Sequence, residues 1–144
     1  MRTITLFLAF LSVLGLVACA TGNHIDTKAI TLSWDIANER TDGTGKSSSD
    51  VSLILKNDDG SERDRILLGT FDGCMAQDAP EDGPLLTLSC WWAGGGDDFQ
   101  VRFEGTDTVV VDHRIVDEAV EIPDFTPMTS VEVPEGVMIS ALAN

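Results

Sequence analysis

The chain has 144 residues and a mass of 15.5 kDa, which fits one domain and leaves little room for a second. Lys and Arg number 9 against 24 Asp and Glu, for a formal charge of −15 and a pI near 4.1. This charge argues against a nucleic-acid partner, because phosphate binding needs clustered cations, and against docking on anionic lipid through a basic patch. The hydrophobic fraction of 43% is too high for a disordered chain.

The first residues form a short basic start followed by an apolar run. Arg2 is the only charged residue before Asp26, and the segment from Ile4 to Val17 is mostly apolar. This pattern is typical of a secretory signal peptide. The alternative is a transmembrane anchor, since the residues from Thr3 to Ala20 are uncharged and approach the minimum length for crossing a bilayer.

The end of this run, Leu16-Val17-Ala18-Cys19, resembles the lipobox of bacterial lipoproteins. The resemblance is confined to the start of the chain and says nothing about the domain that follows. It implies a signal peptide over residues 1–18 and a Cys19 that carries lipid on its thiol and on its new amino group. Residues 19–26 then form the lipidated cysteine and a short tether, and residues 27–144 form the domain. Such an anchor needs no basic patch, because two or more acyl chains hold a protein firmly at a bilayer.

If Cys19 carries lipid, Cys74 and Cys90 remain as a pair in an exported protein. In an oxidising compartment such a pair normally becomes a disulfide, and we expect one here. The bridge would close a loop of about 15 residues and stabilise the fold by about 3 kcal/mol in the chain-entropy model. A metal pair or a redox-active dithiol is the alternative, but the sequence has no C-x-x-C motif and no His between or beside the two residues.

The rest of the chain shows the alternation of apolar and polar residues that is typical of half-buried strands. Turn residues rich in Gly, Asp, Asn and Ser separate the segments, with a polar loop over 41–50 and turns over 57–60, 94–98 and 105–107. The spacing predicts an antiparallel β-sandwich or small β-barrel of about six to eight strands. The expected strands are Thr27–Asp42, Val51–Lys56, Arg65–Phe71, Leu85–Trp92, Phe99–Glu104, Val109–Val116 and one or two pieces between Val131 and Leu142.

Two adjacent tryptophans end one predicted strand. Neighbouring strand residues face opposite sides of a sheet, so Trp92 shares the face of Cys90 and is expected in the core. Trp91 then faces solvent and, with the following Asp97 and Asp98, forms a candidate surface for a sugar or a peptide. The alternative is that Trp91 packs under a loop or that both faces of the sheet are covered.

The acidic turns are weak candidates for Ca²⁺, which prefers carboxylate and carbonyl oxygens. The candidate ligands are Asp58 and Asp59 in one turn and Asp97 and Asp98 in another. The EF-hand pattern fails, because Leu55 stands where that loop needs an acid. Solvated turn residues are the alternative, and we expect no dedicated metal site and no cofactor.

The run Asp112-His113-Arg114 invites a catalytic interpretation, since a His beside an acid is a common pair. Adjacent residues of a strand point apart, however, so Asp112 and His113 are not expected to pair. His113 shares a face with Val109, Val111 and Ile115, which favours a packed histidine. The sequence contains no G-x-S-x-G motif, and we assign no catalytic residue.

These features predict a lipid-anchored protein of the bacterial cell envelope whose β-domain acts by binding or by structural support rather than by catalysis. Ala20, directly after Cys19, implies the outer membrane by the same resemblance to lipoproteins. The expected partners are the membrane, through the lipid, and a protein or glycan that is neutral or basic. A carbohydrate- or Ca²⁺-binding module and an inhibitor of a basic secreted enzyme are the alternatives.

The anchor is tested by Cys19→Ala. Without the thiol the chain cannot be acylated, so we expect incorporation of labelled palmitate to fall to background and the precursor to be released or stranded. Thr21→Ala, in the tether, serves as the control and should keep its lipid. Palmitate that remains on the Cys19→Ala chain would show that the anchor lies elsewhere.

Overall fold

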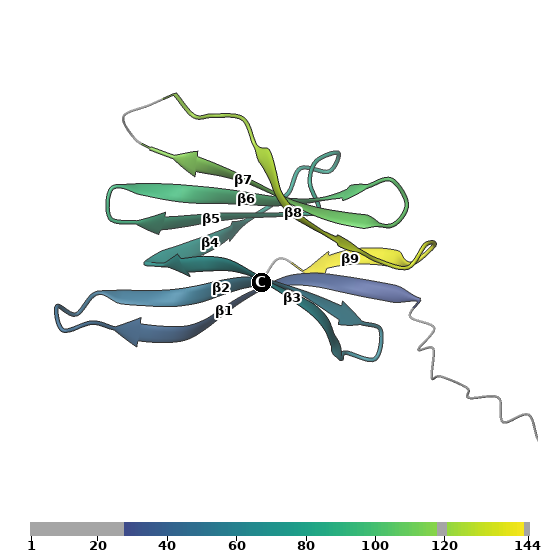
Figure 1. Cartoon of the computed structure of the whole chain (residues 1–144), viewed down its shortest axis with the longest axis horizontal. Helices are drawn as coiled ribbons and strands as arrows, with labels where there is room; N and C mark the ends of the chain where they lie inside the picture. Colours follow the sequence, from purple (N-terminus) through teal and green to yellow (C-terminus); the bar gives the residue numbers. More distant parts are fainter. Residues whose placement is uncertain (1–27, 118–120, 143–144) are drawn as a thin grey trace, which may run out of the picture.

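The computed structural model describes residues 28–117 and 121–142, which form nine β-strands in two facing sheets (Figure 1). The predicted signal peptide, Cys19 and the predicted tether lie outside the described residues. No helix within 28–117 and 121–142 is long and apolar enough to cross a membrane. The expected all-β sandwich is confirmed.

The first sheet has four strands. Their spatial order is β3 (Glu62–Phe71), β2 (Ser47–Asn57), β1 (Ala29–Thr41) and β9 (Met138–Leu142). β1, β2 and β3 pair antiparallel, whereas β9 runs parallel to β1 with Ile30 opposite Ile139. The last strand therefore completes the sheet that the first strand opens.

The second sheet has five strands, all antiparallel to their neighbours. Their spatial order follows the chain: β4 (Gly73–Gln77), β5 (Leu86–Trp92), β6 (Gly95–Glu104), β7 (Thr108–Val116) and β8 (Thr126–Glu132). The chain passes from the first sheet to the second at Asp72 and returns between Glu132 and Met138. Each crossing joins edge strands, so the two sheets close over one core.

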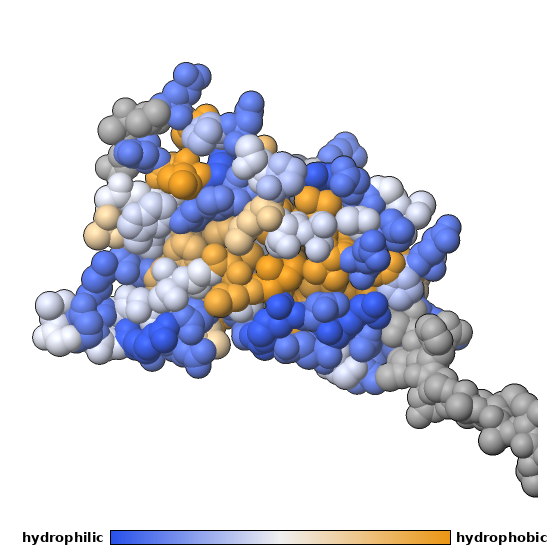
Figure 2. All heavy atoms as spheres, viewed as in Figure 1, coloured by the Kyte–Doolittle hydropathy of each residue, from blue (hydrophilic) through white to orange (hydrophobic). Residues whose placement is uncertain are grey.

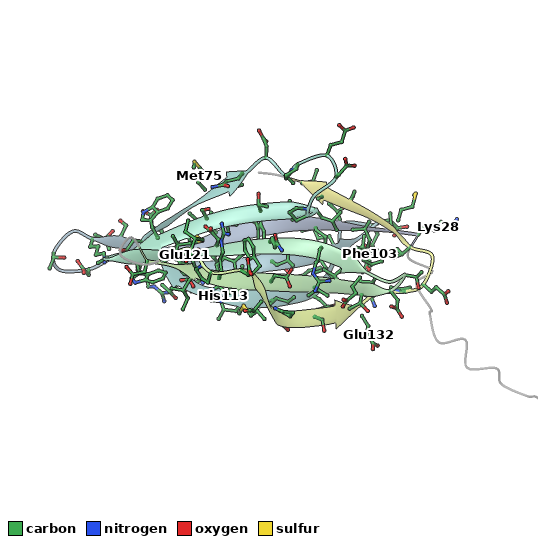
Figure 3. All side chains as sticks on the ribbon, turned by 90° about the horizontal axis from the view of Figure 1, so that it is seen from above. Lys28, Met75, Phe103, His113, Glu121 and Glu132 are labelled. Atoms are coloured by element: carbon green, nitrogen blue, oxygen red, sulfur yellow. A yellow bond between two sulfur atoms is a disulfide. The ribbon has the colours of Figure 1, made fainter. Side chains whose placement is uncertain are left out.

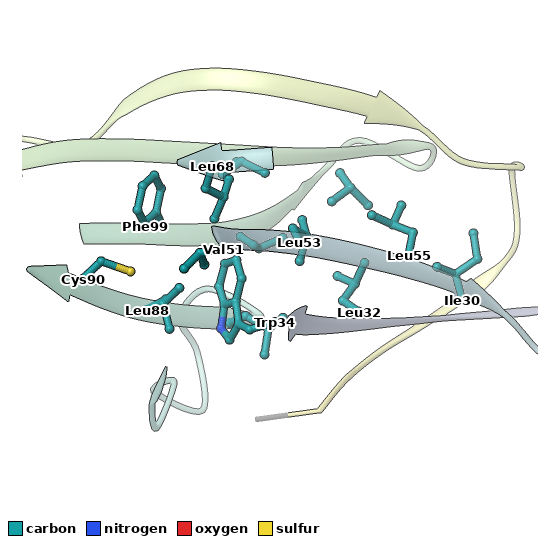
Figure 4. Packing of buried hydrophobic residues seen from close by; sticks show 14 of the residues in the cluster. Ile30, Leu32, Trp34, Val51, Leu53, Leu55, Leu68, Leu88, Cys90 and Phe99 are labelled. Carbon is teal, nitrogen blue, oxygen red and sulfur yellow. The ribbon is translucent and has the colours of Figure 1, made fainter. Parts of the chain in front are cut away.

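The core lies between the sheets because every second side chain points inward. In β1 these are Ile30, Leu32 and Trp34, all buried, and Figure 4 shows them packed against residues of β2 and β5. Full burial of such a side chain stabilises the fold by about 1.5–3 kcal/mol. In the space-filling view the apolar core is visible as an orange band between the sheets, with hydrophilic side chains above and below it (Figure 2).

Three sequence predictions differ from the structure. β2 begins at Ser47, inside the predicted polar loop, and β4 lies in a segment for which no strand was expected. β6 begins at Gly95, so the turn predicted over residues 94–98 is wrong beyond Gly94. In each case polar or small residues form a strand because they pair with a neighbouring strand, although their sequence does not alternate between apolar and polar residues.

The disulfide between Cys74 and Cys90 is confirmed. The two residues are direct partners across β4 and β5, and both face the core side of the sheet. β4 is a short edge strand without a β-branched or aromatic residue. The covalent bond therefore supplies part of the stability that the strand's own side chains do not.

The first described residue, Lys28, lies at one end of the sandwich. Lys28 lies beside the β8–β9 connection, since its carbonyl accepts the amide of Met138. Viewed from above, Lys28, Phe103 and Glu132 lie toward one end and Met75 toward the other (Figure 3). The chain thus enters the domain at the end opposite β4.

Candidate functional site

Trp91 faces outward on the five-stranded sheet, as the alternation along β5 predicts. Leu86, Leu88 and Cys90 of the same strand are buried in the core. Trp91 is 47% exposed and is the one exposed aromatic residue within 28–117 and 121–142. Met75, on the adjacent β4 and the same face, is 59% exposed. These two side chains form an apolar surface at the β4–β5 edge.

The indole of Trp91 lies over Gly73, its direct partner on β4. A Cβ added to Gly73 would come within 2.4 Å of the indole carbon Cζ2 and within 2.6 Å of Cε2. Such contacts are far inside van der Waals distance, so the ring fits only because residue 73 has no side chain. The sequence analysis did not single out Gly73, because the contact depends on the pairing of β4 with β5.

A row of polar side chains crosses the same face from β4 to β7. Gln77 donates its amide to Ser89 Oγ at 2.9 Å, and that hydroxyl donates to Asp98 Oδ1 at 2.6 Å. Arg114 donates from Nε and Nη2 to Asp98 Oδ2, at 3.0 and 2.8 Å. The Arg114 guanidinium lies 4.3 Å from the ring centre of Phe125. We call these four hydrogen-bonded residues, Gln77, Ser89, Asp98 and Arg114, the polar row.

A second polar cluster lies beside this row. Asp112 is only 3% exposed and accepts hydrogen bonds from Gln100 Nε2 at 3.0 Å and from Arg102 Nε at 2.9 Å. The bond from Arg102 to Asp112, together with a second bond to Glu104, raises the pKa of the Arg102 guanidinium above its ordinary value. Arg102 also forms an ion pair with Glu104 at 3.2 Å. The buried Asp112 carboxylate therefore accepts hydrogen bonds from two outward side chains of β6, Gln100 and Arg102, and restrains their positions.

A shallow pocket of about 250 Å³ opens on this face near its other end. Its walls come from β6, β7 and β8, and its lining residues are Arg102, Glu104, Val110 and Pro127–Ser130. The outer face of the sheet therefore carries an exposed aromatic ring toward one end, polar side chains in the middle and a mixed pocket toward the other.

The structure separates the two acids that were expected to accompany Trp91. Asp97 and Asp98 are strand residues of β6 and point to opposite faces. Asp98 joins the face of Trp91, whereas Asp97 lies on the inner face and contacts Nε2 of His113. His113 also stacks on Phe99 at 5.1 Å between ring centres. His113 and Asp112 do not pair, in agreement with the sequence argument.

The acids of the β2–β3 turn are also held by neighbours. Asp59 accepts the hydroxyl of Ser61 at 2.6 Å and its amide at 2.8 Å, and these bonds keep the pKa of the Asp59 carboxyl below its ordinary value. Asp58 lies near the amide of Lys28, at 3.4 Å. In the described part of the chain no group of three or more His, Cys, Asp or Glu is arranged to hold a metal ion.

Comparisons of the chain with protein-family models, with curated proteins and with solved structures give no match. The chemistry of the outer face therefore follows from its own residues. An exposed indole beside hydroxyl, amide, carboxylate and guanidinium groups can stack against a ring and exchange hydrogen bonds with a polar ligand.

The packing of Trp91 on Gly73 is tested by Gly73→Ala. The added methyl group must displace the indole, so we expect a shift in tryptophan emission and a loss of about 1–3 kcal/mol in the free energy of unfolding measured in urea. Gly43→Ala is the matched control, because nothing lies within 4 Å of a Cβ at that position. Equal, small effects of the two substitutions on stability and emission would show that the indole does not lie over Gly73.

Proposed function

We propose that this protein is a lipid-anchored, non-enzymatic binding module of the bacterial cell envelope. Its ligand binds on the outer face of the five-stranded sheet, around Trp91. The observation that carries this proposal is the exposure of Trp91 and Met75 on the same face of two adjacent strands, next to the polar row. Exposed aromatic residues with adjacent polar groups are typical anchors of binding sites.

The position of Trp91 relative to the chain entry supports the proposal. The backbone carbonyl of Lys28 accepts the amide of Met138, and the amide of Val133 donates to Asp107, so residue 28 lies at the end that contains the β8–β9 connection and the β6–β7 turn. Trp91 pairs with Gly96, eight residues before the end of β6 at Glu104. Eight strand residues span about 26 Å. A lipid on Cys19 would therefore attach to the chain ahead of residue 28, at the end of the domain away from Trp91.

The charge of the protein narrows the class of ligand. A formal charge of −15 repels anionic partners over the Debye length of about 8 Å at physiological salt. Asp98 and Asp112, on the face of Trp91, are paired with Arg114 and Arg102, so these carboxylates add little net charge to the site. We therefore expect a neutral or basic ligand.

The binding face is tested by photo-crosslinking in cells with the full-length protein. A photoreactive amino acid at position 75 lies beside Trp91, whereas the same residue at position 67 lies on the outer face of the other sheet, where Leu67 is 63% exposed. We expect an adduct from position 75 and none from position 67. Trp91→Ala should abolish the adduct and Trp91→Phe, which keeps an aromatic ring, should retain it.

Three results of this experiment would contradict the proposal. The first is the absence of any adduct from position 75. The second is an equal adduct yield from positions 75 and 67, and the third is an adduct from position 75 that persists in Trp91→Ala. Each would place ligand binding outside the surface around Trp91.

A further inference from the structure

We infer that the ligand of this face is an uncharged glycan chain, with one sugar ring on Trp91 and the rest of the chain directed along the sheet toward the pocket beside Arg102. This inference rests on the proposed function, because it names the ligand class of the same surface. Four features of the face carry it: the ring, the polar row, the local charge balance and the length of the face.

The first feature is the support of the indole. One side of the Trp91 ring covers Gly73, and the residue keeps 47% of its surface open. A sugar ring presents an apolar C–H surface, which packs on the electron-rich face of an aromatic ring. Since a residue with a Cβ would displace the indole from this position, Gly73 and Trp91 act together as a platform.

The second feature is the chemistry of the groups next to the ring. Ser89 lies two residues before Trp91 on the same face, and it links Gln77 to Asp98. These groups include both donors and acceptors. Sugar hydroxyls donate and accept at the same time, so they can join such a row without leaving a polar atom unpaired.

The third feature is the charge balance of the face. Asp98 is paired with Arg114, and Asp112 with Arg102. A cationic ligand would compete with these arginines, and an anionic ligand would meet the acid excess of the whole protein. An uncharged ligand avoids both costs, because the existing ion pairs stay intact.

The fourth feature is length. Trp91 pairs with Gly96, and Arg102, which lines the pocket, lies six residues further along β6. Six strand residues span about 20 Å. The face is therefore long enough for several linked sugar rings, and its two ends offer separate contacts. Extended peptides more often pair with a free strand edge or fill apolar pockets; Trp91 lies on top of a sheet whose β5 is paired on both sides.

The inference is tested by calorimetric titration of the purified full-length protein with neutral oligosaccharides. The probes are β-1,4-linked glucose, β-1,4-linked N-acetylglucosamine and α-1,4-linked glucose, each from the disaccharide to the hexasaccharide. We expect one series to bind, with affinity rising with chain length. Trp91→Ala should lower the affinity at least about tenfold, which corresponds to about 1.4 kcal/mol. Leu67→Ala, on the other sheet, should leave the affinity unchanged.

A second substitution tests the end of the face away from Trp91, where the pocket lies. Ser130→Phe narrows the pocket that Ser130 and Arg102 line. We expect this substitution to weaken the hexasaccharide and to leave the disaccharide unaffected, because only the longer chain reaches the pocket. An equal loss for both lengths, or for neither, would overturn the proposed direction of the chain.

The titration and the crosslinking experiment together distinguish a wrong ligand class from a wrong binding face. If no neutral glycan binds while the adduct from position 75 forms and contains a protein, the glycan inference fails and the proposed binding face stands. An oligomer of galacturonic acid is the anionic probe, and if it binds in place of the neutral series the charge argument is overturned. If no probe binds and no adduct forms, both proposals fail.

Discussion

The bond between Cys74 and Cys90 fixes the register of β4 against β5, and the proposed binding face depends on that register. Because the two cysteines are opposite each other on the inner side, Gly73 is opposite Trp91 on the outer side. A shift of one residue would turn every side chain of β4 to the other face and would place a Cβ under the indole. An edge strand of five residues without β-branched side chains is weakly specified by packing alone. The covalent link therefore determines both the edge of the sheet and the position of the aromatic ring.

Several charged residues of the five-stranded sheet pair across neighbouring strands. Asp98 meets Arg114, Asp97 meets His113 and Asp112 meets Arg102, each on an adjacent strand of the sheet. Pairing of this kind lets a strongly acidic chain place carboxylates within the sheet at little electrostatic cost. The remaining acids of the loops contribute to solubility and to repulsion from anionic surfaces. The proposed ligand of the five-stranded sheet would accordingly meet paired charges on a molecule whose net charge is strongly negative.

The sequence predicted those parts of the fold in which a strand carries its own pattern. The alternation in β1, β5 and β7 identified these strands and their faces, including the outward position of Trp91. The disulfide was predicted from the two cysteines that remain after Cys19 and from the oxidising compartment expected for an exported protein. The sequence did not predict segments that form a strand only because they pair with a neighbouring strand. β4 has little strand propensity of its own, and the run from Gly94 to Asp98 has the composition of a turn although Asp97 and Asp98 are paired across β6 and β7. The polar row and the contact of Trp91 with Gly73 depend on strand register, which one sequence does not contain.

The register of β4 is measured most directly by NMR contacts between the Hα protons of Gly73 and the ring protons of Trp91. In the oxidised protein we expect strong contacts and an upfield shift of the Gly73 protons from the ring current. After selective reduction of the disulfide these contacts should weaken, while those between Phe99 and His113 on β6 and β7 should persist. Absence of the Gly73–Trp91 contacts in the oxidised protein, or their full retention after reduction, would contradict the claim that the disulfide positions Trp91.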